Sequence, residues 1–246
     1  MTGGKLGSTA LYPACPGAIP GLQVEAGSYL VRFARTPDDL DRVLRLRYEI
    51  FNLELGEGLD ESHATGRDED ELDARFQHPL IQRRDSLAVV GTYRMQTAEM
   101  ARQGGGFYAD PEFDLSTLPD PVRDATVEID RACVAKDHRS GRVLHLLWRG
   151  LAAYLEWNRK HYFFGCCSLT NQDPAMGVAV HRHLEASGFV HPTLEVAPRP
   201  GGRCELPPGH PLPGRRCSSL APPRRQSARS PGHRPSVQDH RLASYP

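Results

Sequence analysis

The chain has 246 residues, of which 39% are hydrophobic and 24% charged, and its formal net charge is zero. These values fit one good-sized domain with appendages and exclude the strong basic field that marks many nucleic-acid-binding proteins. No stretch reaches the roughly 20 apolar residues that cross a bilayer, and residues 1–27 hold no basic segment followed by an apolar one. We therefore expect a cytoplasmic protein that binds no nucleic acid and contacts the inner membrane only peripherally, if at all.

The first predicted elements are a strand and a helix. Residues 1–28 are rich in Gly, Pro and Ala without periodicity, so we expect a disordered N-terminal extension. A short strand is predicted over residues 28–34. Thr36 then acts as an N-cap, followed by Pro37 and two acids, and apolar residues at helical spacing extend this helix to about Glu54.

The middle of the chain predicts three strands. After an acidic loop over residues 59–76, strands over 79–82 and 87–95 form a hairpin. A helical fragment, a glycine run and a Pro-rich loop occupy residues 96–125. The strand that follows, over 126–134, reads as a central one.

The C-terminal part predicts a helix over residues 143–157, a strand over 161–169 and a last helix over 174–187. The resulting order β-α-β-β-β-α-β-α predicts an α/β fold with helices on both faces of a sheet, as one domain over residues 29–197. From residue 198 to 246, Arg, Pro, Ser and Gly dominate and no apolar period remains. We expect that segment to be a disordered tail.

Arg47 interrupts the apolar stripe of the first predicted helix, three residues after Leu44 and four before Phe51. A buried arginine needs a partner, because an unpaired buried charge is costly. Alternatively, its alkyl stem lies along the core and its guanidinium reaches the surface. Spacing alone favours neither arrangement.

An acidic run over residues 67–73 contains Asp70 and Asp73. A solvated charged loop is the simpler interpretation of such a run. The functional alternative is a cluster of carboxylates that binds the ammonium groups of a cationic substrate.

The predicted central strand carries three charges, at Glu128, Asp130 and Arg131. Alternation places Glu128 and Asp130 on one side and Arg131 on the other. Such charges are depleted in central strands. They indicate either a buried Glu–Arg pair or a carboxylate whose raised pKa suits a general base, and Arg94 on the preceding strand fits both.

The segment that joins this strand to the next helix contains Arg139, Gly141 and Arg142. Backbone N–H groups at such a junction can bind an anion, and the arginines add charge for a phosphate-bearing partner. A glycine-containing turn by itself is weak support, since every strand–helix connection needs a turn.

Several of these positions together resemble a known family. The charged residues occur in the order found in acyl-homoserine-lactone synthases, and further segments resemble the bacterial ornithine-lipid N-acyltransferases, which are hemolysin-like GNAT proteins. The segments are Gly105-Gly-Phe-Tyr108, Leu147-Trp-Arg-Gly150 and Gly165-Cys-x-Ser168. The resemblance covers about residues 29–195.

The resemblance implies a GNAT fold, with a mixed central sheet and helices on both faces, in which the final strands are apparently missing. It implies transfer of a (3-hydroxy)fatty acyl group from acyl carrier protein, or from acyl-CoA, to the α-amine of an amino acid, with ornithine expected and a lyso-lipid as product. No bound cofactor and no metal are expected. Glu128 is the expected base. The substrate residues are Arg47, Asp70, Asp73, Arg94 and Arg131, and the acyl-donor residues are Cys133, Val134, Arg139, Gly141 and Arg142.

Three departures from related patterns leave alternatives open. Arg142 and Leu144 stand where acetyl-CoA enzymes of this fold carry glycines, which favours a carrier-protein donor. Asp130 stands where a small residue is expected. The tail lacks the pattern of the two last strands. The alternatives are therefore an acyl-CoA-dependent acetyltransferase of a small amine, an acyl-homoserine-lactone synthase, and an inactive truncated or frameshifted relative.

Overall fold

The computed structural model describes residues 12–167, 169, 173–200 and 206. The expectations for residues 1–11 and for nearly all of the tail after residue 200 lie outside the described residues. The chain divides into two compact units, Met1–Pro111 with Leu118–Cys166 and Glu112–Thr117 with Cys167–Pro246. The predicted domain over 29–197 spans both units. In the described ranges, every helix is too short or too polar to traverse a bilayer.

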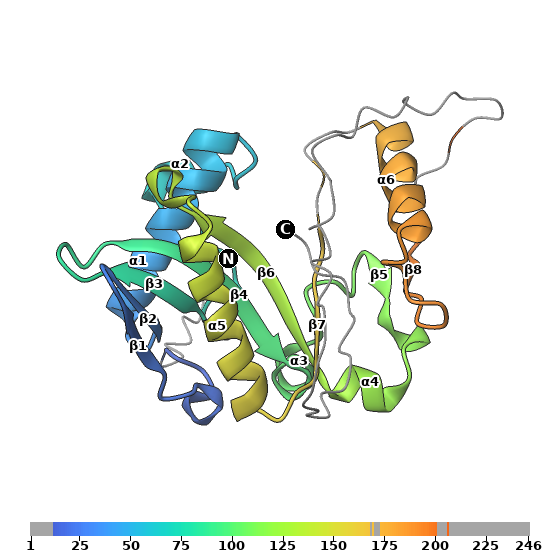
Figure 1. Cartoon of the computed structure of the whole chain (residues 1–246), viewed down its shortest axis with the longest axis horizontal. Coiled ribbons are helices and arrows are strands. Elements are labelled where there is room, and N and C mark those ends of the chain that lie inside the picture. The colour runs from blue at the N-terminus through green and yellow to red at the C-terminus, as the bar shows by residue number, and fades with distance from the viewer. Residues whose placement is uncertain (1–11, 168, 170–172, 201–205, 207–246) are drawn as a thin grey trace, which may run out of the picture. The chain divides into compact units, whose positions relative to one another are not determined.

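The first unit is built on a six-stranded sheet with the order β1-β2-β3-β4-β6-β7 (Figure 1). The first five strands pair antiparallel, and β7 pairs parallel with β6, which makes the sheet mixed as predicted. The strands are β1 Gln23–Ala26, β2 Tyr29–Phe33, β3 Pro79–Arg83, β4 Val89–Thr97, β6 Thr126–Val134 and β7 Tyr162–Phe164.

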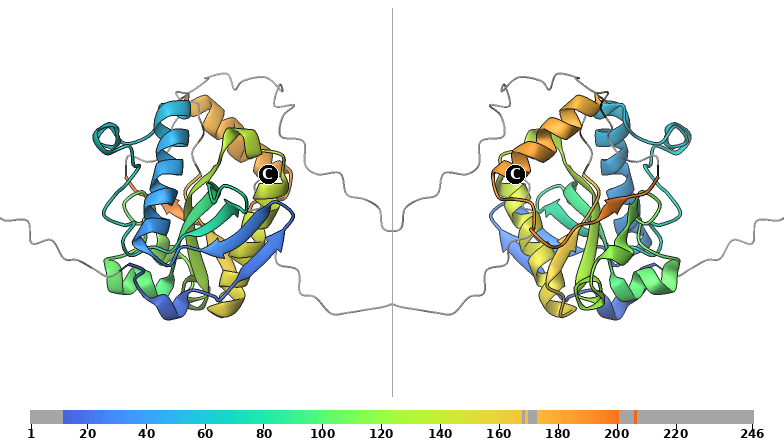
Figure 2. Two further views of the ribbon diagram at one scale, coloured as in Figure 1. Left: turned by 90° about the vertical axis from the view of Figure 1, so that its left-hand side faces the viewer. Right: turned by 90° about the vertical axis from the view of Figure 1, so that its right-hand side faces the viewer.

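Helices cover both faces of this sheet, and Figure 2 shows α1 and α5 on opposite sides of it. The helices of the unit are η1 Pro16–Ala18, α1 Pro37–Arg47, the π-helix η2 Tyr48–Leu55, α2 Ser62–Thr65, α3 Ala98–Gly104, α4 Asp120–Asp124, η4 Lys136–His138 and α5 Arg142–Trp157. The predicted start of the first helix is confirmed, because the Thr36 hydroxyl accepts a 3.1 Å hydrogen bond from the Asp39 backbone N–H. The single helix predicted to about Glu54 is an α-helix that continues as a π-helix.

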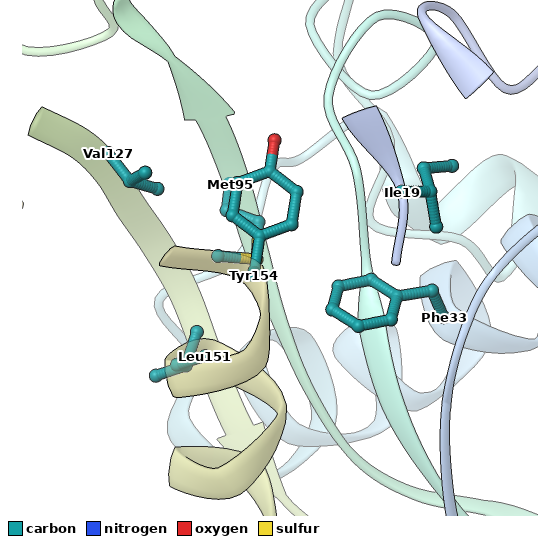
Figure 3. Packing of buried hydrophobic residues seen from close by; sticks show 6 residues of the cluster. All are labelled: Ile19, Phe33, Met95, Val127, Leu151 and Tyr154. Carbon is teal, nitrogen blue, oxygen red and sulfur yellow. The ribbon is translucent and has the colours of Figure 1, made fainter. Parts of the chain in front are cut away.

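The face of the sheet under α5 carries a hydrophobic core. Figure 3 shows its six buried residues, Ile19, Phe33, Met95, Val127, Leu151 and Tyr154. Neighbouring side chains of a strand point to opposite faces, so the residues next to Met95 and Val127 point toward the α1 face. Those neighbours are Arg94 and Glu128, and this alternation is what brings the charged residues of β4 and β6 together.

The N-terminal extension predicted over residues 1–28 is ordered where the structure describes it. β1 pairs with β2 through four residues, and Tyr12 and Ile19 are buried. The prediction of disorder was wrong for this part, because β1 is a short edge strand with little apolar alternation of its own. Its stability depends on pairing with β2 rather than on local sequence.

The second unit contains β5 Phe113–Asp114, η3 Leu115–Thr117, α6 Pro174–Ala186 and β8 Ala197–Pro198. β5 and β8 form a separate antiparallel pair. α6 begins where predicted, with the Asp173 carboxylate accepting a 2.9 Å hydrogen bond from the Ala175 N–H. Among the described residues after β7, β8 is the one strand, and it does not join the six-stranded sheet.

Candidate active site

Arg94 is the centre of a cluster of ion pairs on the α1 face of the sheet. Its Nε and Nη2 atoms each donate a 2.8 Å hydrogen bond to Asp130, one to each carboxylate oxygen. Its Nη1 atom contacts both oxygens of Asp70, at 2.6 and 2.7 Å, and Oδ1 of Asp73 at 3.2 Å. The side chain is fully buried, and the ring of Tyr108 lies 5.3 Å from its Cζ atom. Each nitrogen of the buried Arg94 guanidinium therefore has a carboxylate partner, as a buried charge requires.

Arg47 extends this cluster into a closed ring. It pairs with Asp73 through Nη1 and with Asp68 through Nη2 at 3.1 Å. The other oxygen of Asp68 lies 3.1 Å from Nη1 of Arg131. The peptide bond that joins Arg131 to Asp130 closes the ring. Because the Arg47 side chain is fully buried, the arrangement in which its guanidinium reaches the surface is wrong.

A bulge in β6 brings Arg131 to the ring. The antiparallel register pairs Thr92 with Cys133. The next pair joins Arg94 with Asp130, which leaves one residue more on β6 than on β4 between the two pairs. Arg131 takes a left-handed conformation with φ 46° at this point. Strict alternation places Arg131 on the other face of the strand from Asp130. That prediction was wrong, because the extra residue of the bulge reverses the alternation.

The ring carries an excess of negative charge. Three arginines face four carboxylates, namely Arg47, Arg94 and Arg131 against Asp68, Asp70, Asp73 and Asp130. Burial by itself would raise the pKa of Asp73, but the charges of Arg47 and Arg94 outweigh it and hold this pKa below its ordinary value. The cluster therefore favours a cation next to it.

Only part of the ring is accessible to a ligand. The side chains of Asp70 and Arg131 are 23% and 18% exposed, whereas that of Asp73 is 1% exposed. Both oxygens of Asp73 are occupied, because its Oδ2 accepts a 2.9 Å hydrogen bond from the Asp70 N–H. Arg47, Arg94 and Asp73 are thus enclosed in the interior, and Asp70 and Arg131 are the partly exposed members of the cluster.

Glu128 lies beside the ring and is bound separately. Its Oε2 atom accepts hydrogen bonds from the Gln96 side chain at 2.7 Å and the Tyr108 N–H at 2.9 Å. Its Oε1 atom accepts from the Ala109 N–H at 2.8 Å. Burial raises the pKa of Glu128, and these donors limit the rise. The carboxylate therefore takes up a proton more readily than an exposed glutamate.

The loop that supplies two of these donors begins at a pair of glycines. Gly105 and Gly106 have φ values of 94° and 115°, a region that favours glycine. The Phe107 N–H donates to Asp110 at 2.7 Å, so successive amides of this loop are held by carboxylates. Sequence reasoning missed the amides of residues 108 and 109, and also Asp68 and Gln96. The one signal for Gln96 is its place opposite Glu128 in the β4–β6 register.

The surroundings of two expected acyl-donor residues, Cys133 and Arg139, limit what each can do. Burial raises the pKa of the Cys133 thiol to about 12, so this cysteine is a neutral thiol near neutral pH and no nucleophile. Arg139 donates from Nε to the Val134 carbonyl at 2.9 Å and forms two bonds of 2.6 and 2.8 Å with Glu54. Arg139 therefore ties the end of β6 to the π-helix.

Gly141 and Arg142 lie at the start of α5. Gly141 is the N-cap residue, with φ 79°, and Arg142 is exposed. The guanidinium of Arg142 lies against Gly27 in the turn between β1 and β2. The structure thus gives Arg142 a partner surface different from that of Arg139.

Comparisons with known proteins agree with this architecture. A family model described as an acetyltransferase (GNAT) domain matches residues 46–149. The L-ornithine N(alpha)-acyltransferase of Rhodobacter capsulatus is 33% identical over 173 residues, which are 66% of this chain and 66% of that protein. The enzyme of the same name from Agrobacterium fabrum is 32% identical over 179 residues, which are 70% of this chain and 59% of that protein.

Among solved structures, the acyl-homoserine-lactone synthase LasI is similar with a TM-score of 0.43 and 17% identity, over 65% of this chain and 78% of that one. The chain spans about two thirds or less of the length of the curated relatives it matches. The chain thus carries a segment that matches the GNAT domain model, and over 66–70% of its length it is similar to the L-ornithine N(alpha)-acyltransferases.

Proposed function

We propose that the chain transfers a fatty acyl group from a thioester to the α-amine of ornithine. The observation that carries this proposal is the ring of ion pairs. It has one more carboxylate than arginines, and one carboxylate and one arginine are partly exposed. These features suit ornithine, which has an α-carboxylate and a second ammonium group on its side chain. The names of the relatives support the same substrate.

The two accessible charges define how the amino acid binds. Asp70 takes the side-chain ammonium, and Arg131 takes the α-carboxylate through a charge-assisted pair. Both oxygens of Asp73 are already occupied, by the two arginines and by the Asp70 N–H, so in this proposal Asp73 holds Arg47 and Arg94 in place. The α-amine is then presented toward Glu128.

Glu128 acts as the base. An α-ammonium is mostly protonated near neutral pH, so a carboxylate must accept a proton, directly or through water, before the amine can attack. The neutral amine then forms the C–N bond with the thioester carbonyl carbon. The C–S bond breaks, and the thiolate leaves with the second amine proton. Glu128 returns its own proton to solvent.

The end of β6 is where the thioester would lie. β7 pairs with β6 only as far as Glu128, so in the described part of the chain the backbone near Cys133 and Val134 has no partner from β7. N–H groups there are the donors we assign to the tetrahedral oxyanion. Arg139, Gly141 and Arg142 then border the phosphate-bearing arm of the donor.

The donor in this proposal is an acyl carrier protein with a 3-hydroxyacyl group. Arg142 and Leu144 stand where a glycine-rich pyrophosphate cradle for CoA would need small residues, which disfavours CoA. The acidic surface of a carrier protein would complement the arginines at the start of α5. The product, a lyso-lipid, would place the enzyme at the inner membrane surface during release.

Incubating the purified chain with 3-hydroxyacyl carrier protein or acyl-CoA, and with ornithine, lysine or norvaline, tests the proposal when products are read by mass spectrometry. We expect acylated ornithine from the carrier-protein donor and little from norvaline, which lacks the side-chain amine. Glu128→Gln should lower kcat/KM at least about 100-fold, as loss of a general base does. The exposed Glu156→Gln is the matched control. A folded wild-type chain that acylates no amino acid would refute the function.

A further inference from the structure

Two successive cross-strand pairs on the same face of β4 and β6 hold their carboxylates in different ways. The register places Arg94 opposite Asp130 and Gln96 opposite Glu128. An arginine keeps its carboxylate charged, whereas a neutral carboxamide donates a hydrogen bond without adding a charge. The second pair therefore brings no positive charge next to Glu128.

The carboxamide of Gln96 joins Glu128 to the loop that begins at Gly105. Its Nε2 atom donates to Oε2 of Glu128 at 2.7 Å and to the carbonyl of Gly106 at 3.4 Å. Both side chains belong to residues that are 1% exposed. Gln96 therefore holds the carboxylate and the glycine turn in one geometry.

Counting lone pairs shows which oxygen of Glu128 can receive a proton. Each carboxylate oxygen has about two acceptor positions. Oε2 accepts from Gln96 and from the Tyr108 N–H, so both of its positions are filled. For Oε1 the described residues supply one donor, the Ala109 N–H. One acceptor position on Oε1 is left.

We propose that Gln96 is a positioning residue for acyl transfer, which occupies Oε2 of Glu128 and fixes the carboxylate so that Oε1 takes the proton from the amine. This inference rests on the proposed function, in which Glu128 is the base. A side chain without a donor would open one acceptor position on Oε2 and leave the carboxylate held only by the N–H groups of Tyr108 and Ala109. A cationic side chain would hold Glu128 charged and make it a weaker base.

The test compares Gln96→Met, which removes the donor at nearly constant volume, with Gln96→Glu, which replaces it by an acceptor. The matched control is Gln82→Met, since Gln82 is also buried in the sheet but binds the Leu87 carbonyl at 2.7 Å rather than a carboxylate. For each folded variant, kcat/KM is measured against pH. The pKa of Glu128 is measured separately by NMR of ¹³C-labelled glutamate, which needs no activity.

Removing a donor to the charged form raises the pKa of Glu128, so the base stays protonated to higher pH. We expect the acid limb of kcat/KM to move up by about one pH unit in Gln96→Met, as loss of one charge-assisted hydrogen bond implies. Gln96→Glu should move it further, and Gln82→Met should leave it in place. The NMR pKa should follow the same order.

A purely structural role for Gln96 would lower kcat/KM equally at every pH and leave the pKa of Glu128 unchanged, and that result would overturn the inference. If Gln96→Met does not fold, Gln96→Glu and the NMR titration give the same decision. Failure of the proposed function is a different outcome, because the wild-type chain would then acylate no amino acid while the pKa of Glu128 still responded to Gln96.

Discussion

Arg94 and Asp130 face each other across β4 and β6 and share two parallel hydrogen bonds, each 2.8 Å long. The family resemblance leads to the expectation of a small residue at position 130. Here Asp130 is the carboxylate by which the ring's negative charges outnumber its arginines. Without it, three arginines would face three aspartates. The departure from the family pattern therefore adds one negative charge to this cluster.

Asp73→Asn tests whether the buried half of the ring supports the fold. The change leaves Arg47 and Arg94 buried with fewer carboxylates, and breaking a buried pair in this way costs about 3–5 kcal/mol. Urea denaturation followed by circular dichroism should show the free energy of unfolding falling by that amount. Unchanged stability would mean that the ring does not hold the sheet together.

Asp70→Asn tests the accessible half. Asp70 is partly exposed, so the substitution should change stability much less than Asp73→Asn does. We expect KM for ornithine to rise about 10-fold, as loss of one charge-assisted contact of about 1.4 kcal/mol implies, with a smaller change in kcat. Activity toward norvaline should not change, since that substrate has no side-chain ammonium. An equal loss for both amino acids would show that Asp70 does not read the side chain.

His78 predicts a pH dependence of stability. Burial lowers the pKa of His78 to about 4, from 6.5 for an exposed histidine. Below pH 6.5 the unfolded chain gains a proton that the folded chain does not take up until about pH 4. Protonation thus favours unfolding, and stability should fall by up to about 3 kcal/mol across this window.

Denaturation of the wild type and of His78→Gln, measured between pH 7 and pH 4, checks this dependence. The variant should lose most of the slope, and the exposed His161→Gln should keep it. Equal slopes in all three chains would mean that His78 is accessible to protons in the folded state.

Cys133→Ala tests for a covalent route. The thiol is buried and its pKa is raised to about 12, so it is neither ionised nor accessible at neutral pH. We expect kcat to stay within about threefold of the wild-type value, because acyl transfer needs no thiolate here, and removal of a buried sulfur acts mainly on packing. Mass spectrometry of wild type quenched during turnover should show no acyl group on Cys133. A 100-fold loss of kcat in a variant that folds normally would instead support Cys133 as a covalent nucleophile.

Much of the fold follows from local sequence. The helix start at Thr36 was predicted from its capping residue, and the β3–β4 hairpin and β6 were predicted from their apolar patterns. β1 was missed because its order comes from pairing with β2. The π-helical continuation of α1 has no signal in a periodicity of 3.6 residues.

The site was less predictable, because its geometry depends on register. Spacing identified Arg47 as an anomaly but named no partner, and Asp68 stood unmarked inside the acidic run. The bulge before Cys133 cannot be read from alternation, so Arg131 was placed on the wrong side. The backbone donors of residues 108 and 109 carry no side-chain signal at all.

The closure of the ring through the Asp130–Arg131 peptide bond constrains how this protein can diverge. Each inner member is shared by at least two partners, so a single replacement there changes the balance of charge in the interior. Changes would have to be made in compensating pairs. Asp70, at the edge of the ring, is not under that constraint. A lineage that adopted a different amino acid would therefore be expected to vary Asp70 first and keep Arg47, Asp73 and Arg94 together.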